Sequence, residues 1–144
     1  MTAGFENQLR LALHGCRGNW SKREDVMITG DYQPLVGCFR DMHVRQLVLE
    51  YCTPRAGELA VIGRALGDRE IGLGVVNPRT DEAESPESIV ARAEEAMEFW
   101  QPEQIYLNPD CGFGCFANRC VNVEEIAAAK LRSMVEAARR LRAG

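Results

Sequence analysis

Features that would place a protein at once in a broad functional class are scarce in this sequence. No apolar run approaches the roughly 20 residues that a membrane-spanning helix needs. The N-terminus lacks a basic segment followed by an apolar stretch, so no signal peptide is predicted. Positive charge is not in excess, because the net charge is −4, and this disfavours nucleic acid as a partner. We therefore expect a cytoplasmic protein with no membrane and no nucleic-acid partner.

Histidine is scarce as well, with two in 144 residues, so the position of each is informative. Cysteine is more abundant, and its six residues lie at positions 16, 38, 52, 111, 115 and 120. The chain is long enough for one domain with a real core and has no secretory signal, so reduced thiols fit better than three disulfides. We expect Cys38 and Cys52 in the core and His43 on the surface.

Short apolar runs alternate with amphipathic segments along the chain. The apolar runs predict strands at 8–14, 46–51, 70–76 and 104–107, the last of them ended by Asn108 and Pro109. The amphipathic segments predict helices at 31–42, 58–66, 86–100 and 122–142, with Asp31, Ser85 and Asn122 at helix starts. Strands that alternate with helices indicate an α/β fold class, with four consecutive βα units and a parallel sheet.

Four side chains that bind metals lie where predicted strands end. His14 and Cys16 come at the end of the first strand, Glu50 ends the second, and Cys111 follows the fourth. Because the carboxyl ends of parallel strands meet at one edge of a sheet, we expect these side chains to face one another. Two thiolates, an imidazole and a carboxylate are a tetrahedral zinc set. The alternative for Cys111 is a buried structural cysteine, and no C-x-x-C pair supports zinc.

The same residues resemble a known family. His-x-Cys, a strand ending in Glu, and Asn-Pro-Asp-Cys-Gly together resemble the C-terminal catalytic barrel of cobalamin-independent methionine synthase. The sequence HGCRGN at 14–19 is most similar to the shorter methionine synthase II-type branch, which neighbours the epoxyalkane:coenzyme M transferases. Further similar stretches lie at 50–59, 72–76, 84–87 and 130–142. The resemblance implies half of a TIM (β/α)8 barrel of the methionine synthase/uroporphyrinogen decarboxylase type.

The resemblance also implies a function. A zinc ion would be bound by His14, Cys16, Glu50 and Cys111, and the chain would transfer a methyl or alkyl group to a thiol, homocysteine or a related one. Zinc removes the proton of a coordinated thiol, and two thiolates with a carboxylate keep the site electron-rich. Glu50 is the hardest and weakest ligand, so we expect it to yield to an incoming thiol. Cys111 and Glu50 are therefore the predicted catalytic residues.

Other residues on this edge are candidates for substrate binding. Arg17, Asn19 and Arg55 lie in the loops that follow the first two strands, where they would bind an anionic group or tether the loops. Asp110 would orient a metal ligand or cap a turn. Each residue therefore has a functional and a structural interpretation, and the sequence alone leaves both open.

The sequence departs from the family pattern in two ways. Family barrels have about eight βα units, and this chain has four, so residues 1–144 are expected to form a single partial domain, the C-terminal half of a barrel. Open sheet edges would then require a homodimer, a partner subunit that completes the barrel, or a longer protein of which this chain is a fragment. Arg79 lies nearest the position where methionine synthases have a histidine acid, so the alkyl donor stays open between folate and a corrinoid.

Two other functions are compatible with the same residues. One is a non-catalytic zinc-binding half-barrel that acts as a subunit of a larger complex. The other is a zinc enzyme that uses metal-bound water. Coordination of a substrate thiol to zinc distinguishes the transferase from both.

Overall fold

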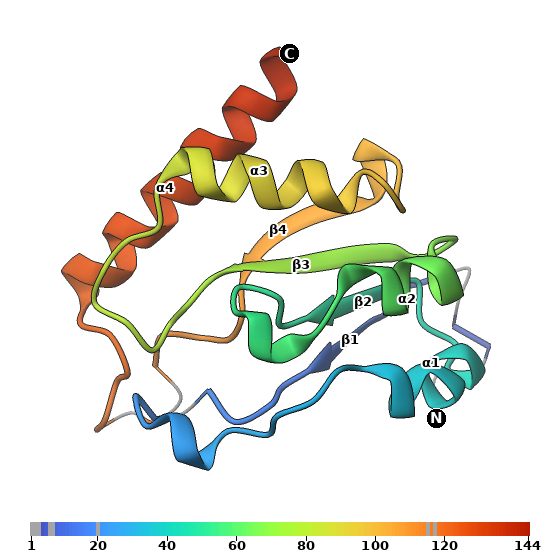
Figure 1. Cartoon of the computed structure of the whole chain (residues 1–144), viewed down its shortest axis with the longest axis horizontal. Coiled ribbons are helices and arrows are strands. Elements are labelled where there is room, and N and C mark those ends of the chain that lie inside the picture. The colour runs from blue at the N-terminus through green and yellow to red at the C-terminus, as the bar shows by residue number, and fades with distance from the viewer. Residues whose placement is uncertain (1–3, 6–7, 20, 115, 117) are drawn as a thin grey trace.

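The computed structural model describes residues 4–5, 8–19, 21–114, 116 and 118–144 (Figure 1). Its four strands form one sheet in the order β1-β2-β3-β4, and every neighbouring pair is parallel. The strands are β1 (Ala12–Gly15), β2 (Gln46–Leu49), β3 (Glu70–Val76) and β4 (Ile105–Pro109). The helices between and after them are α1 (Val36–Asp41), α2 (Leu59–Leu66), α3 (Pro86–Ala96) and α4 (Glu124–Ala143). The predicted α/β class with four βα units is confirmed.

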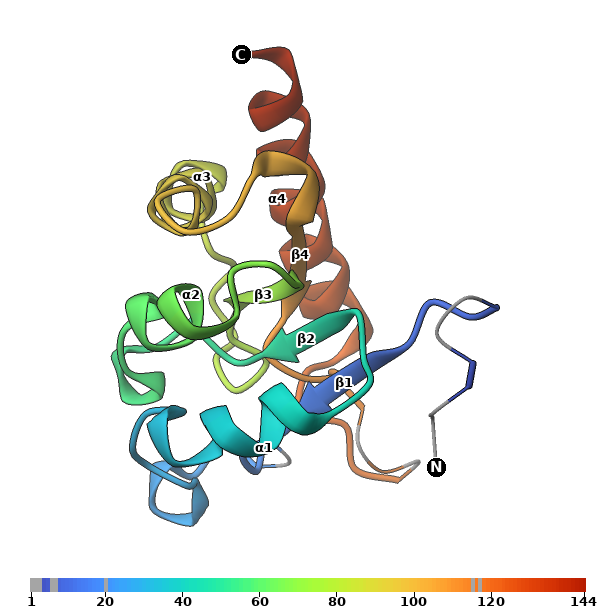
Figure 2. The ribbon, with the colours of Figure 1, turned by 90° about the vertical axis from the view of Figure 1, so that its right-hand side faces the viewer.

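The helices cover one face of the sheet. Figures 1 and 2 show α1, α2 and α3 side by side along this face, with α4 beside α3 and β4. Leu47 and Ile71, which are paired in the strand register, point to this face and are fully buried. Leu59, Ile62 and Leu66 on α2 are buried against it, as their spacing on one helical stripe predicts. The hydrophobic core therefore lies between the sheet and the helices.

The opposite face of the sheet is much more open. His14, Val48, Gly72 and Tyr106 lie in one row across the four strands, because each is paired in register with the next. His14 and Tyr106 are exposed, Val48 is partly exposed, and Gly72 has no side chain. In a closed barrel such a row lies in the interior. This open face is therefore the concave side of an incomplete barrel.

Several predicted boundaries are wrong. β1 begins at Ala12 rather than residue 8, because Gln8 and Leu9 lie in a turn whose two N–H groups donate to the Phe5 carbonyl. The helix predicted at 31–42 is a 3-10 turn, Gln33–Leu35, followed by the short α1. Residues 8–14 alternate as a strand does, and residues 31–42 have helical spacing. In each segment, however, only part of the sequence forms the regular element.

Two further boundaries differ at proline and asparagine. β4 continues through Pro109, which is aligned with Val76 after a register shift at the end of β3. Proline is tolerated there because β4 is an edge strand and the ladder is irregular at this point. α4 begins at Glu124, with Val123 at its N-cap, whereas Asn122 donates from Nδ2 to Thr80 O at 2.9 Å. By contrast, Ser85 caps α3 as predicted, since its Oγ accepts the Ser88 N–H at 3.1 Å.

The cysteines are distributed differently from the prediction. Cys38 lies on the exposed side of α1, so its assignment to the core was wrong. Cys52 is partly buried, and His43 is exposed as predicted. No disulfide joins the five cysteines that the structure describes, and Cys115 lies outside the described residues. Among the described helices, none is both long and apolar enough to cross a membrane.

Candidate metal centre

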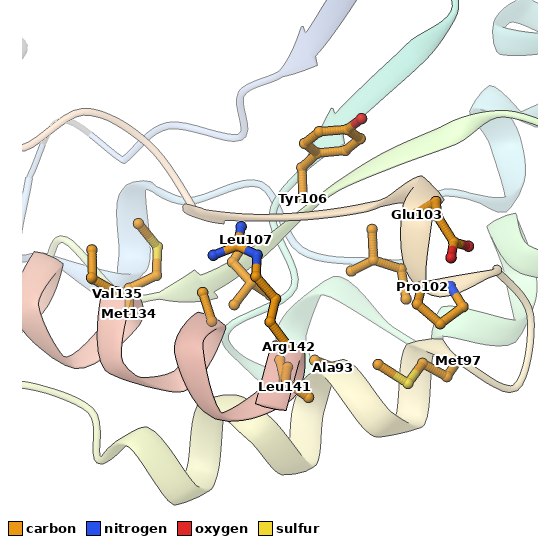
Figure 3. A pocket seen from close by; sticks show the side chains of 12 residues that line it. Ala93, Met97, Pro102, Glu103, Tyr106, Leu107, Met134, Val135, Leu141 and Arg142 are labelled. Atoms are coloured by element: carbon orange, nitrogen blue, oxygen red, sulfur yellow. The ribbon is translucent and has the colours of Figure 1, made fainter. Parts of the chain in front are cut away.

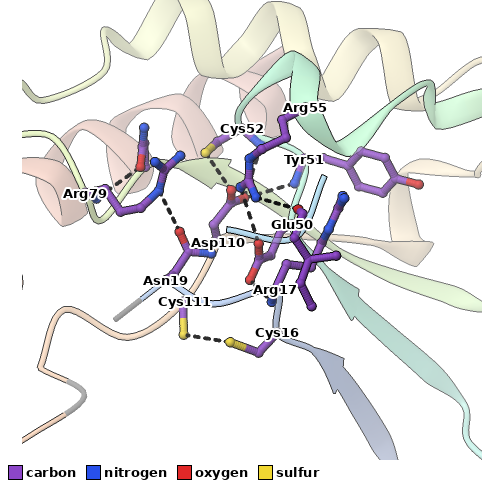
Figure 4. Close-up of polar contacts among 12 residues, drawn as sticks. Cys16, Arg17, Asn19, Glu50, Tyr51, Cys52, Arg55, Arg79, Asp110 and Cys111 are labelled. Carbon is purple, nitrogen blue, oxygen red and sulfur yellow. Dashed lines mark hydrogen bonds and ion pairs between the residues drawn. The ribbon is translucent and has the colours of Figure 1, made fainter. Parts of the chain in front are cut away.

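Three of the predicted ligands meet at the carboxyl ends of the strands. His14 is in β1, Cys16 directly follows that strand, and Cys111 follows β4. One ligand atom from each lies within 4.8 Å of the others, and the two Sγ atoms are 3.8 Å apart (Figure 4). Two thiolates on a tetrahedral zinc ion at about 2.3 Å are separated by about 3.8 Å. The spacing of the two thiols therefore fits zinc without rearrangement.

The His14 ring is held by the neighbouring strand. Its Nδ1 lies 3.1 Å from the carbonyl oxygen of Val48 on β2. A ring nitrogen can satisfy a carbonyl only as an N–H donor, so Nδ1 carries the proton and Nε2 has the free electron pair. Metal-binding histidines are commonly oriented by such a bond from the other ring nitrogen. His14 is thus in the tautomer that can bind a metal through Nε2.

Glu50 lies nearby but outside the group of three. It directly follows β2 and is fully buried, and its Oε1 accepts the backbone N–H of Arg17 at 2.7 Å. Its Oε2 accepts no hydrogen bond from any described residue and lies 3.8 Å from Arg55 Nη2. A buried carboxylate oxygen without a donor is costly unless a cation compensates it. This unsatisfied oxygen is compatible with a fourth ligand, and that role of Glu50 stays a prediction.

Asp110 connects the segment that carries Cys111 to the segment that carries Glu50. Its Oδ1 accepts the N–H groups of Tyr51 at 2.9 Å and Cys52 at 3.1 Å. Its Oδ2 accepts the Cys52 thiol at 2.7 Å. Burial raises the pKa of Asp110 to about 6, and burial together with the nearby carboxylate raises the pKa of the Cys52 thiol. Cys52 therefore stays protonated and donates, which is not the chemistry of a metal ligand.

Arg17 and Arg55 hold the loop that follows the first predicted ligands. Arg17 donates from Nη2 to Gly30 O, and Arg55 donates from Nη1 to Ile28 O at 2.9 Å. The structure thus supports the tethering interpretation of both. Nevertheless, Nη1 of Arg17 and Nε and Nη2 of Arg55 are buried and donate to no described residue. Nη2 of Arg55 faces the Glu50 carboxylate as an ion pair at 3.8 Å, so Arg17 Nη1 and Arg55 Nε are the donors left for an anionic group at this edge of the sheet.

Asn19 and Arg79 form a second polar contact beside the cluster. Both are buried, and Arg79 Nε donates to Asn19 Oδ1 at 2.9 Å. This contact joins the loop after β1 to the loop after β3 (Figure 4). Asn19 is therefore a structural tie in this geometry, and its predicted role in substrate binding stays a prediction.

A buried lysine on α4 holds the loop after β3, and this contact was not predicted from the sequence. Lys130 on α4 is fully buried, and its Nζ lies 3.3 Å from both Thr80 Oγ1 and Glu84 Oε2. Glu84 Oε1 in turn accepts the Asn77 N–H at 2.8 Å. α4 contains many charged residues, so the sequence does not distinguish Lys130 from the exposed ones. Only its place among apolar residues on one face of the helix could have indicated that it is buried.

The residues present fit a zinc ion. Two thiols at the tetrahedral spacing, an imidazole nitrogen and an unsatisfied buried carboxylate oxygen lie at one edge of the sheet. Thiolate and imidazole together are typical of zinc rather than of calcium or magnesium, which prefer oxygen ligands. The donor set therefore favours zinc over the hard divalent cations.

Comparison with known proteins gives the family. The family model for the cobalamin-independent synthase catalytic domain matches residues 5–140. The chain belongs to the cobalamin-independent synthase family. Its relatives include the methionine synthase of Thermococcus kodakarensis, 31% identical over 129 residues that make up 90% of this chain and 33% of that protein. The uncharacterized protein YxjH of Bacillus subtilis is 32% identical over 136 residues, which are 92% of this chain and 35% of that protein.

A solved structure agrees on the fold. The B12-independent methionine synthase of a Shewanella species, in complex with selenomethionine, superposes with a TM-score of 0.81 at 15% identity. The match covers 98% of this chain and 40% of that protein, so the chain has the fold of part of a TIM barrel. The chain spans about one third of the length of the curated relatives it matches.

Proposed function

We propose that this member of the cobalamin-independent synthase family provides the zinc-binding part of a transferase that moves a methyl or alkyl group to a thiol. Homocysteine or a related thiol is the proposed acceptor, as the names of the methionine synthase relatives suggest. The observation that carries the proposal is the group of His14, Cys16 and Cys111, whose ligand atoms lie within 4.8 Å of one another. Its position at the carboxyl ends of the strands is where barrel enzymes bind their substrates.

Residues of this chain would have two roles, metal binding and substrate orientation. His14, Cys16 and Cys111 would hold the metal, and Glu50 would be a fourth ligand, the one expected to give way to a substrate thiol. When bound, zinc lowers the pKa of a substrate thiol and so supplies a nucleophile at neutral pH. Arg17 and Arg55 are proposed to orient the substrate through a carboxylate or sulfonate, because several of their buried N–H groups have no acceptor among the described residues.

The side chain of Arg79 is relevant to which alkyl donor the site could use. It lies after β3 and is buried against Asn19. An arginine side chain does not give up its proton in proteins, so it cannot act as a general acid for a departing nitrogen. Arg79 would therefore not supply a proton to a folate leaving group, and the alkyl donor stays open between folate and a corrinoid, whose leaving group needs no proton.

The proposal is tested by metal content and by thiol binding together. We expect about one zinc ion per chain, lost in Cys111→Ser and kept in Cys38→Ser, which removes an exposed thiol on α1. Adding homocysteine to the cobalt-substituted chain should then give a new thiolate-to-cobalt absorption band. Zinc that is unchanged in Cys111→Ser would disprove the site. Bound metal without any response to thiols would favour the non-catalytic zinc-binding subunit.

A further inference from the structure

We propose that Asp110 is a positioning residue that fixes Cys111 relative to Glu50, and that Gly74 is the residue that makes its reach possible. The inference rests on the proposed metal site and concerns a residue that does not itself bind the metal. It explains why a second acidic side chain is buried close to Glu50 and next to Cys111, where a further negative charge is unfavourable.

The contacts of Asp110 span three strands. Its N–H donates to Val76 O at the end of β3, at 2.9 Å. Its carboxylate passes beyond β3 to the end of β2, where it accepts the N–H groups of Tyr51 and Cys52 and the Cys52 thiol. Asp110 is only 1% exposed, so these bonds are shielded from water. The carboxylate thus caps the chain just after β2 from a residue that belongs to the end of β4.

Gly74 leaves the space that this contact needs. A Cβ atom at position 74 would lie 2.1 Å from Asp110 Oδ1, 2.8 Å from Leu49 O and 3.0 Å from Tyr51 N. The first distance is far below any real contact of a carbon atom. Any side chain at position 74 would therefore push the carboxylate away from the end of β2. The strand is almost wholly apolar, and this close approach accounts for a glycine in it.

The hydrogen bonds from the segment after β2 to the Asp110 carboxylate form a bridge, and the residues at its two ends are sequence neighbours of predicted ligands. Asp110 precedes Cys111, and Tyr51 follows Glu50. Without the bridge, the segments after β2 and β4 could shift independently, and the ligands would no longer be held at one spacing. Loss of a group that orients a metal ligand typically costs 10–100-fold in metal affinity. If Asp110 were only structural, its removal would lower the stability of the fold and leave the zinc affinity of the folded protein unchanged.

The test compares zinc affinity, measured by competition with a chelator, with thermal unfolding of the metal-free chain. We expect Asp110→Ala and Gly74→Ala each to weaken zinc binding roughly 10–100-fold and to change the visible spectrum of the cobalt form. Asp110→Asn keeps an oxygen that can accept the two N–H groups, so it should weaken zinc binding less than Asp110→Ala does. Glu70→Gln, at the amino ends of the strands, should lower the unfolding temperature without changing zinc affinity.

Each contrary result is distinct. If Asp110→Ala binds zinc as tightly as the wild type while its unfolding temperature falls, Asp110 is structural and the inference is wrong. If Asp110→Asn loses as much affinity as Asp110→Ala while Gly74→Ala loses none, the charge acts rather than the position, and the inference is again wrong. Should Asp110→Ala not fold, Asp110→Asn and Gly74→Ala still decide. A wild type that binds no zinc would instead overturn the proposed function.

Discussion

At the scale of single residues, the metal-binding set divides into what a sequence can reveal and what it cannot. Cys16 and Cys111 could be placed together because both follow parallel strands, and the structure brings their sulfur atoms to 3.8 Å. The Nδ1 bond of His14 and the bridge made by Asp110 depend on carbonyl and N–H groups of other strands. Such partners have no sequence signature, because every residue has the same backbone groups.

Arg55 should discriminate between charged and neutral thiols. Its Nε is buried without an acceptor among the described residues, while its Nη2 pairs with Glu50 Oε2 at 3.8 Å, so an anionic substrate would gain a charge-assisted hydrogen bond from Nε. Arg55→Ala is expected to weaken homocysteine binding to the cobalt form roughly 10-fold or more, and 2-mercaptoethanol binding hardly at all. Equal weakening of both thiols would mean that Arg55 only tethers the loop at Ile28.

At the scale of elements, the strongly patterned segments were predictable and the others were not. β3 has the predicted bounds because a continuous apolar run can only be a buried strand here, and α3 begins after Ser85 as its capping residues indicate. The segment at 31–42 has helical spacing, yet only Val36–Asp41 is α-helical. Asn122 is an equally good cap by type, but it binds the loop after β3 instead. Competing tertiary partners decide such cases.

Glu70 ties the amino ends of the strands together, far from the metal ligands. Its carboxylate accepts from Arg10 Nε at 3.0 Å and from Arg45 Nε at 2.7 Å, and Arg10 stacks on the Tyr106 ring of β4. Glu70→Gln removes the negative charge and one of the two acceptor oxygens that the half-exposed arginines share, so the unfolding temperature should fall by roughly 1–4 °C. Calorimetry of the wild type and variant at one pH measures this shift. An unchanged temperature would show that the contacts contribute nothing measurable.

Lys130 should control the mobility of the loop at 77–84. Its Nζ is the contact that links α4 to Thr80, Glu82 and Glu84 in that loop. Lys130→Met keeps the aliphatic stem but removes the donor, so loop amides should exchange with deuterium at least several-fold faster. Amides of β1 and β2 serve as the internal control and should not change. Uniformly faster exchange would indicate general destabilisation instead.

At the scale of the whole molecule, the described residues form part of a barrel in which β1 and β4 are the outer strands, each paired on one side only. Beside the free edge of β4, an apolar groove of about 460 Å³ lies between that strand, α3 and α4 (Figure 3). Met97, Tyr106 and Val135 line it and are exposed. The homodimer expected from the sequence would cover this groove with a second copy of the chain, because two sets of four strands supply the eight of a closed barrel.

A homodimer of this kind should depend on the groove between β4, α3 and α4. Sedimentation equilibrium should give twice the chain mass of 16.1 kDa for the wild type. Val135→Glu places a charge in the groove and should shift the equilibrium to the monomer by at least 10-fold. Arg64→Glu on α2 changes the charge of an exposed residue outside the groove lining and should leave the mass unchanged. A monomeric wild type would contradict a barrel made of two copies.

The most direct test of the account is X-ray absorption at the zinc edge of the purified, zinc-loaded chain. The proposed ligands predict two sulfur neighbours at about 2.3 Å and lighter nitrogen or oxygen neighbours at about 2.0–2.2 Å. Cys16→Ser should reduce the sulfur count to one, and Cys38→Ser should leave it at two. A spectrum without sulfur neighbours, or one unchanged by Cys16→Ser, would contradict a zinc centre built on His14, Cys16 and Cys111.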